Sequence, residues 1–280
     1  MGLFNFLEGQ YLKEGSGIYR NAPQKQSAFR RFFSIFGTKF WSLVRANLLY
    51  ILLSLPLITG GLAAAGLTYI TRNAARGKFA YPCADFFSTV RRTWKQALPA
   101  GLISLAVNAL FGFNIYFYVV QLFFSTAAAP ATAWVMLLVN VLGMLFFSFV
   151  NYYVYLQIIT FSLTLKQIYK NAAMFAIANL YKNLLIFVCL LATVALLGVL
   201  PMLVTDYRIW GFVCLVLYVT IYPAYRQLLI QFTIFPFVKK TMIDPYYEAH
   251  PEADKTAMRT LNIDIPDEED NAVFEDTQPL

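Results

Sequence analysis

The polar residues that could do chemistry in this 280-residue chain are amides and one deep cation, set within long apolar stretches. These candidates are Asn47, Asn108, Asn114, Asn140, Asn151, Gln157, Arg226 and Gln227. Amides donate and accept hydrogen bonds, as recognition of a polyhydroxylated solute requires. Amides also bridge packed helices inside membranes, so a packing role is the alternative for each of them.

Arg226 is the candidate with the most suggestive neighbours. It follows Tyr222, Pro223 and Tyr225 at the end of an apolar stretch. A proline frees a backbone carbonyl one turn earlier and bends the helix there. A cation beside such a bend is a candidate solute site, although an arginine close to the membrane surface needs no special purpose.

Catalytic and metal chemistry is poorly supported by the residue inventory. The apolar stretches contain no Asp or Glu, and the only histidine, His250, comes after them. Cys83, Cys189 and Cys214 are far apart and lack a CxxC pattern, so we interpret them as buried apolar thiols. No phosphate-cradling GxxxxGK[ST] motif occurs. We therefore expect no enzyme activity, no metal and no cofactor.

The composition indicates a membrane protein. The chain is 59% hydrophobic and 13% charged, whereas soluble domains are roughly 45–50% apolar and about 25% charged. We therefore predict an all-α, polytopic integral membrane protein. Its basic residues are scattered between apolar stretches and form no compact motif, so we expect the lipid bilayer as a partner and no nucleic acid.

Six apolar segments predict about six transmembrane helices arranged as three hairpins. They are residues 36–54, 57–72, 98–124, 131–155, 184–204 and 209–229. Basic residues lie before the first segment, between the second and third, between the fourth and fifth, and after the sixth. The positive-inside rule therefore places these stretches, and with them both termini, in the cytoplasm. This division gives a cytoplasmic N-terminal segment (1–27), a membrane domain (28–240) and an acidic cytoplasmic tail (241–280) that we expect to be disordered.

The first two segments admit other arrangements. Residues 40–70 contain Pro56, Gly60 and Gly61 near their centre, where a hairpin needs its turn. One long kinked helix would place the basic residues that follow on the outer side, against the charge rule. A re-entrant loop that enters from the cytoplasmic side would respect that rule. Two spans are our prediction, and the re-entrant loop stays open.

Three basic stretches predict amphipathic connecting helices at the cytoplasmic surface, over residues 29–41, 84–98 and 166–183. Each could instead extend the span that follows it. A weak internal repeat accompanies them, because Tyr152, Tyr155 and Gln157 match Tyr222, Tyr225 and Gln227 in order and spacing. Such repeats often build transporters. The alternative is the aromatic composition common to all membrane interfaces.

The first apolar stretch resembles the N-terminal signature of YesL-like bacterial membrane proteins. The similar residues are Asn47-Leu48-Leu49-Tyr50, Leu55-Pro56-Leu57-Ile58-Thr59-Gly60 and Ala63-Ala64-Ala65-Gly66-Leu67. Residues around Trp94-Lys95 and Leu165-Lys166 are similar to the two cytoplasmic stretches of that family. Thr59-Gly60-Gly61-Leu62 departs from the Gly-Pro-Ala sequence expected there, and the acidic tail lies outside the pattern.

The resemblance implies a multi-pass protein of a bacterial plasma membrane, in a family whose function is uncharacterised. Family members are often encoded beside sugar-uptake permeases and polysaccharide-degrading enzymes, and the family supplies no catalytic residue. We therefore expect an accessory or assembly component of carbohydrate uptake that contacts a sugar permease complex. The alternatives are an independent small-solute (sugar) facilitator and a membrane sensor whose acidic tail binds a partner.

Overall fold

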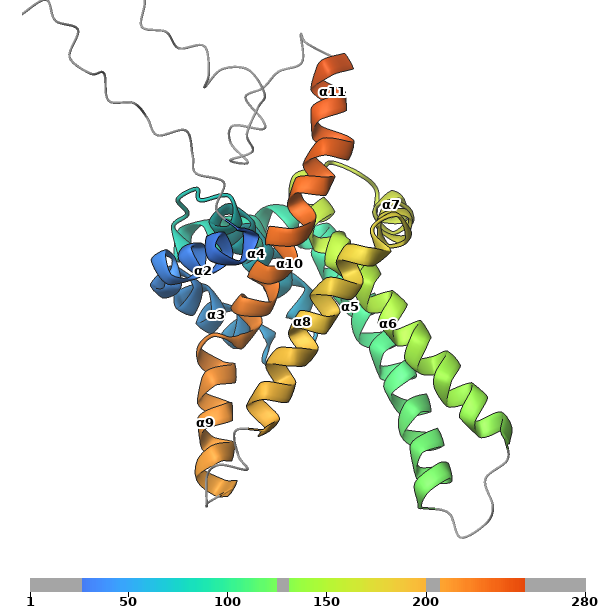
Figure 1. Ribbon diagram of the computed structural model, residues 1–280. Helices are drawn as coiled ribbons and strands as arrows, with labels where there is room; N and C mark the ends of the chain where they lie inside the picture. The colour runs from blue at the N-terminus through green and yellow to red at the C-terminus, as the bar shows by residue number, and fades with distance from the viewer. Residues whose placement is uncertain (1–26, 125–130, 200–206, 250–280) are drawn as a thin grey trace, which may run out of the picture.

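The computed structural model describes residues 27–124, 131–199 and 207–249, and every regular element in these ranges is a helix (Figure 1). The predicted all-α class is therefore confirmed. The N-terminal segment up to residue 26 and the tail from residue 250 lie outside the described residues. Their cytoplasmic placement and the disorder of the tail remain predictions.

Three helices of the described part are long and apolar enough to cross a membrane. They are α5 (Pro82–Phe123), α6 (Ala131–Thr160) and α8 (Leu180–Val199). A fourth results if α9 (Tyr207–Thr220) and α10 (Tyr222–Val238), which are bent by 52°, form one broken span. These helices support the membrane class, whereas the predicted count of six spans is not confirmed.

The first helix pair is too short for two ordinary crossings. Helices α3 (Phe40–Ser54) and α4 (Gly60–Ala75) have 15 and 16 residues, or about 22–24 Å at 1.5 Å per residue, against a hydrocarbon core of ~30 Å. Figure 1 shows that this pair ends well above the far ends of α5, α6 and α9. The geometry favours the re-entrant alternative for residues 40–70.

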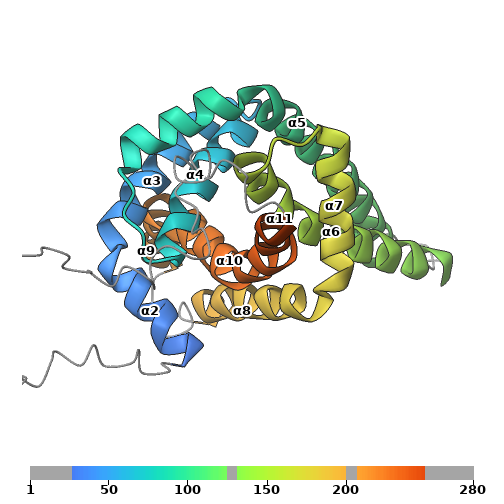
Figure 2. The same ribbon diagram turned by 90° about the horizontal axis from the view of Figure 1, so that it is seen from above.

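Three helical segments lie across the level from which the long helices descend (Figures 1 and 2). They are α2 (Ala28–Thr38), α7 (Leu165–Ala178) and the first part of α5. Pro99 lies inside α5 and accounts for its change of direction, because proline removes a helical hydrogen bond. Helices thus occur at the three predicted connecting segments. The one at residues 84–98 extends into the descending helix, and residues 180–183 of the third belong to α8.

One tyrosine fixes α7 against this bend. The Tyr169 hydroxyl donates to the Ala100 carbonyl over 3.3 Å. Burial raises the pKa of the Tyr169 phenol above its usual value of 10, so it remains a donor at neutral pH. Gln96, on the lying part of α5, donates to the Leu163 carbonyl over 2.7 Å. These contacts hold two lying segments together.

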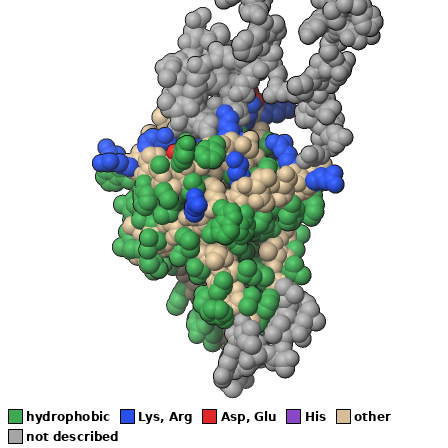
Figure 3. All heavy atoms as spheres, turned by 90° about the vertical axis from the view of Figure 1, so that its left-hand side faces the viewer, with side chains coloured by type: hydrophobic (Ala, Val, Ile, Leu, Met, Phe, Trp, Pro, Cys, Tyr) green, Lys and Arg blue, Asp and Glu red, His purple; other side chains and the backbone are tan. Residues whose placement is uncertain are grey.

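Lys and Arg side chains gather at the level of the lying segments. Figure 3 shows them in a band above a largely hydrophobic surface. Within α2, Phe29 and Phe33 are exposed beside Arg30 and Arg31, whereas Phe32 is buried against Tyr225. A border between cationic and apolar surface is characteristic of helices at the lipid headgroup level.

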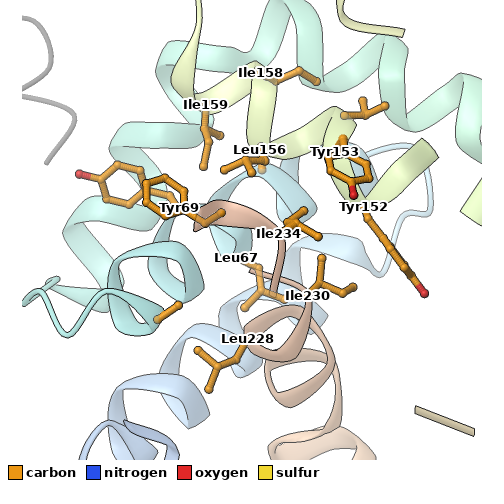
Figure 4. Close-up of a cluster of buried hydrophobic side chains, with 14 of the residues drawn as sticks. Leu67, Tyr69, Tyr152, Tyr153, Leu156, Ile158, Ile159, Leu228, Ile230 and Ile234 are labelled. Carbon is orange, nitrogen blue, oxygen red and sulfur yellow. The ribbon is translucent and has the colours of Figure 1, made fainter. Parts of the chain in front are cut away.

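The apolar core forms where α4, α6 and α10 meet. Helix α4 is buried without a break from Ala65 to Ala75. Leu67, Leu156 and Ile230 converge there from the three helices (Figure 4). The helices run in the same direction, as successive contacts between α4 and α10 show. Thr68 bonds to Gln227, and two turns later Arg76 stacks on Phe235 at 5.1 Å.

A similar order of elements precedes each of these three helices. Helices α2 and α3 precede α4, the lying and descending parts of α5 precede α6, and α7 and α8 precede α9 and α10 (Figure 2). The residues of the predicted internal repeat lie on α6 and on α10. The repeat thus has a structural counterpart in two helices that both pack on α4.

The segment after α10 begins as a helix, whereas we expected disorder from residue 241. Helix α10 continues through a π-helical turn, Lys239–Ile243, into α11 (Asp244–Ala249). Pro245 follows the π-helical turn inside this continuous helix, where a proline removes one helical hydrogen bond. The helix nevertheless continues to Ala249, so residues 241–249 of the predicted tail are helical.

Helices α4 and α5 cross in backbone contact at Gly61 and Gly101. A Cβ on Gly61 would lie 2.6 Å from the Gly101 Cα and would also collide with the Ala97 carbonyl oxygen. These atoms belong to the backbone and cannot move aside easily. Small residues allow helices in a membrane to approach this closely.

Substitution of Gly61 by alanine should therefore destabilise the protein, while Gly60→Ala should not. A Cβ on Gly60 meets nothing within 4 Å, and overpacking at Gly61 costs on the order of 1–3 kcal/mol. The measurement is the midpoint of thermal unfolding in detergent. Equal midpoints for Gly61→Ala and Gly60→Ala would contradict the crossing.

Candidate functional site

A pocket with a volume of about 80 Å³ lies where α3, α4, α6 and α10 meet. Its lining residues are Tyr50 of α3, Ala64 and Leu67 of α4, Asn151, Tyr152 and Tyr155 of α6, and Pro223, Arg226, Gln227 and Ile230 of α10. A water-sized group needs about 10–15 Å³ of such space, so the pocket accommodates roughly five to eight heavy atoms. It is large enough for a small polar group.

Tyr152 gives this pocket an unpaired hydroxyl on a largely buried side chain. Its side chain is only 5% exposed, and its hydroxyl forms no hydrogen bond with any residue that the structure describes. Figure 4 shows the hydroxyl directed away from the apolar cluster of Leu156 and Ile230. The hydroxyl oxygen itself is not fully buried, so a ligand in the pocket can reach it.

Arg226 supplies positive charge at the edge of the pocket. It is exposed and forms no hydrogen bond or ion pair with another described residue. Two lysines, Lys239 and Lys240, follow the other end of α10. Lys239 lies about 20 Å from Arg226 along the helix at 1.5 Å per residue. The partial positive end of α10, which begins at Tyr222, lies on the same side as Arg226.

Gln227 and Asn151 are held in place by neighbouring polar groups. The Gln227 side-chain nitrogen donates to Thr68 Oγ1 over 2.8 Å, and the Thr68 hydroxyl donates to the Ala64 carbonyl over 2.6 Å. Asn151 accepts a hydrogen bond from the Ser104 hydroxyl over 2.9 Å. The Gln227 carbonyl oxygen makes no hydrogen bond with a described residue, so this wall still offers an acceptor to a ligand.

Asn47 supports the pocket from behind and does not line it. Its fully buried side chain accepts from the Ala224 N–H over 2.9 Å and donates to the Val219 carbonyl over 2.8 Å. These two backbone groups lie on either side of the break between α9 and α10 at Ile221. One amide therefore satisfies groups that a broken helix leaves unpaired. The bend predicted beside Pro223 occurs here, and Asn47 holds it.

The remaining predicted residues lie elsewhere. Asn108 and Asn140 donate to carbonyls of their own helices one turn earlier. Asn114 is half-buried on the descending part of α5. Gln157 is fully buried on α6, and neither atom of its amide has a hydrogen-bond partner among the described residues. Of the eight candidates, the structure brings Asn151, Arg226 and Gln227 together in the pocket.

Sequence reasoning missed the tyrosines of the pocket and the polar residues of α4. Arg72 is the last residue of the predicted segment 57–72, where a cation at the membrane surface is expected, but its side chain is fully buried. It donates to Thr160 Oγ1 over 3.2 Å and to Asn73 over 3.3 Å, and it lies 4.9 Å from the Tyr69 ring centre. The buried face of α4 could have been recognised from its polar residues, which recur at helical spacing: Thr68, Thr71, Arg72 and Asn73.

The interpretation of the cysteines as buried thiols is wrong. Cys83 and Cys189 are exposed, and Cys214 is half-exposed. Cys189 and Cys214 lie on α8 and α9, where apolar residues face outward, so hydropathy alone did not distinguish lipid-facing from core positions. Across the described ranges, no cluster of three His, Cys, Asp or Glu side chains could hold a metal ion.

Residues 43–115 match the model of DUF624, a family described as a protein of unknown function. This region includes Tyr50 and Arg72, but it excludes the pocket residues of α6 and α10. Comparisons with curated proteins and with solved structures find no match. The chain is therefore similar to a family of unknown function over part of its length, and the YesL-like assignment remains a prediction.

The Asn47→Leu substitution should destabilise the protein because it leaves the Ala224 N–H and the Val219 carbonyl without their partner. A buried unsatisfied group costs roughly 1–3 kcal/mol. Asn140→Leu is the matched control, since Asn140 bonds only within its own helix. We expect a lower midpoint of thermal unfolding in detergent for Asn47→Leu alone. Equal midpoints for the two variants would show that Asn47 does not hold the break.

Proposed function

We propose that the protein is a non-enzymatic membrane component of solute uptake that binds a small polar solute in the pocket. The observation that carries this proposal is the unpaired hydroxyl of Tyr152, a largely buried residue that lines the pocket beside Arg226 and Gln227. Hydroxyl and amide groups orient a hydroxylated ligand through donated and accepted hydrogen bonds. A carbohydrate has the matching chemistry, and the YesL-like resemblance implies the same solute class.

The protein would act as an accessory or assembly component because the sequence contains no ATP-binding loop. The exposed pair of α5 and α6 supports contact with another membrane protein. Leu110, Phe113 and Tyr116 are each more than 60% exposed on the descending part of α5. In a bilayer such a surface packs against lipid or against the helices of a permease.

An independent facilitator is the second candidate. The parallel packing of α4, α6 and α10 around one pocket favours it, because transporters place solute sites between repeated elements and at broken helices. We further propose a bacterial plasma membrane location, with the basic band of Figure 3 on the cytoplasmic side according to the positive-inside rule. The sensor alternative depends on tail residues outside the described part.

Binding of saccharides to the purified protein in lipid nanodiscs tests the proposed site. Tyr152→Phe removes one hydroxyl and should weaken binding roughly 2- to 12-fold, which corresponds to the loss of one neutral hydrogen bond. Asn108→Leu is the control, because Asn108 does not line the pocket. Equilibrium dialysis with labelled mono- and oligosaccharides provides the measurement. No binding of any neutral or phosphorylated saccharide, or equal binding by Tyr152→Phe, would contradict the proposal.

Two further measurements separate the uptake roles. An accessory component should copurify from native membranes with a permease, and its deletion should reduce sugar uptake. A facilitator should give saccharide flux in vesicles that contain this protein alone. If neither copurification nor flux is observed, the uptake role fails even where the pocket binds a solute.

A further inference from the structure

We propose that the solute in the pocket is anionic and that its oxyanion group binds between the Arg226 guanidinium and the Tyr152 hydroxyl. This inference rests on the proposed solute-binding function, and it narrows the class of solute. A phosphate or carboxylate group has the required chemistry.

The charge of the pocket is positive and uncompensated. The Arg226 guanidinium is a cation, and no Asp or Glu is among the lining residues. The acidic residues Asp85, Asp244 and Glu248 of the described part lie in the first turn of α5 and in α11. Electrostatic attraction to an anion is stronger at a site with low dielectric constant than in water.

The free hydrogen-bond donors of the lining outnumber its free acceptors, even when the Gln227 carbonyl oxygen and the phenol oxygens are counted. Arg226 only donates, and two phenols of the pocket, Tyr50 and Tyr152, have no hydrogen-bond partner among the described residues. The partial positive end of α10 adds to this bias. A neutral polyol needs donors and acceptors in balance, whereas an oxyanion only accepts. The donor excess therefore favours an oxyanion.

The size of the pocket fits one anionic group better than a whole saccharide. The available volume of about 80 Å³ accommodates roughly five to eight heavy atoms, and phosphate has five. The rest of a larger solute would extend past Arg226, which lies on the exposed side of the pocket. A phosphorylated sugar and a phospholipid headgroup both supply this chemistry, so the experiment must distinguish these two sources.

The test compares Arg226→Gln and Arg226→Lys with Arg45→Gln, a matched change at an exposed arginine of α3 that does not line the pocket. The probes are inorganic phosphate, glucose 6-phosphate and glucose, added to protein in phosphatidylcholine nanodiscs. Equilibrium binding is measured at several salt concentrations. Because a charge-assisted hydrogen bond is lost, Arg226→Gln should weaken binding of the phosphorylated probes roughly 10- to 150-fold. Arg226→Lys should retain part of the affinity, and Arg45→Gln should retain all of it.

The source of the anion is distinguished by a second lipid composition. Phosphatidylglycerol in the nanodiscs should compete with the soluble probes if a headgroup occupies the pocket, and Arg226→Gln should remove this competition. Without competition, a soluble phosphorylated solute is the ligand. Either result supports an oxyanion site at Arg226.

Two results would overturn the inference, and they differ in what they leave standing. In the first result, glucose binds as tightly as glucose 6-phosphate and Arg226→Gln loses no affinity for either. This would disprove the proposal that the solute is anionic but preserve the proposed solute pocket. No binding of any probe or lipid headgroup would remove both. If Arg226→Gln misfolds, Tyr152→Phe provides the second variant, because it should weaken phosphate binding while Arg45→Gln does not.

Discussion

The enclosure of α4 is the constraint on which the rest of the structure depends. This helix is too short to cross a bilayer in the usual way, and three longer elements surround it. Contact between Gly61 and Gly101 brings α5 against one side. On its other sides, Thr68 accepts a hydrogen bond from Gln227 of α10, and Arg72 donates one to Thr160 of α6. Because lipid cannot satisfy backbone and polar groups, an enclosed position makes such a polar helix possible at membrane depth.

The pocket is a consequence of that packing. Helices α6 and α10 both lie against α4, so side chains from three parallel helices meet around one small space. The break between α9 and α10 places Arg226 there, and Asn47 satisfies the backbone groups that the break would leave unpaired. Polar groups are costly inside a membrane. A binding function therefore best explains why Tyr152, Arg226 and Gln227 lie together at one junction.

Composition and hydropathy were sufficient to predict the helical class and the presence of long apolar helices. The proline rule also located the bend beside Arg226, because its effect is local to the helix. Hydropathy could not show whether an apolar segment faces lipid or other helices. For that reason the small residues of α4 were predicted to form a span, and Cys189 was predicted to be buried.

The pocket was only partly predictable for a related reason. Asn151, Arg226 and Gln227 stood out because they are polar residues in apolar stretches, but the same signal also selected Asn108 and Asn140, which bond within their own helices. The contact that distinguishes these two groups is tertiary. Tyr152 was overlooked because tyrosine is common at membrane interfaces.

The central claim is that the junction of α4, α6 and α10 holds a ligand between Tyr152 and Arg226. A high-resolution cryo-electron microscopy map of the protein in lipid nanodiscs with glucose 6-phosphate tests it most directly. Our account predicts compact, non-protein density within hydrogen-bond distance of the Tyr152 hydroxyl and the Arg226 guanidinium. A pocket filled by protein side chains or by a lipid acyl chain alone would contradict it.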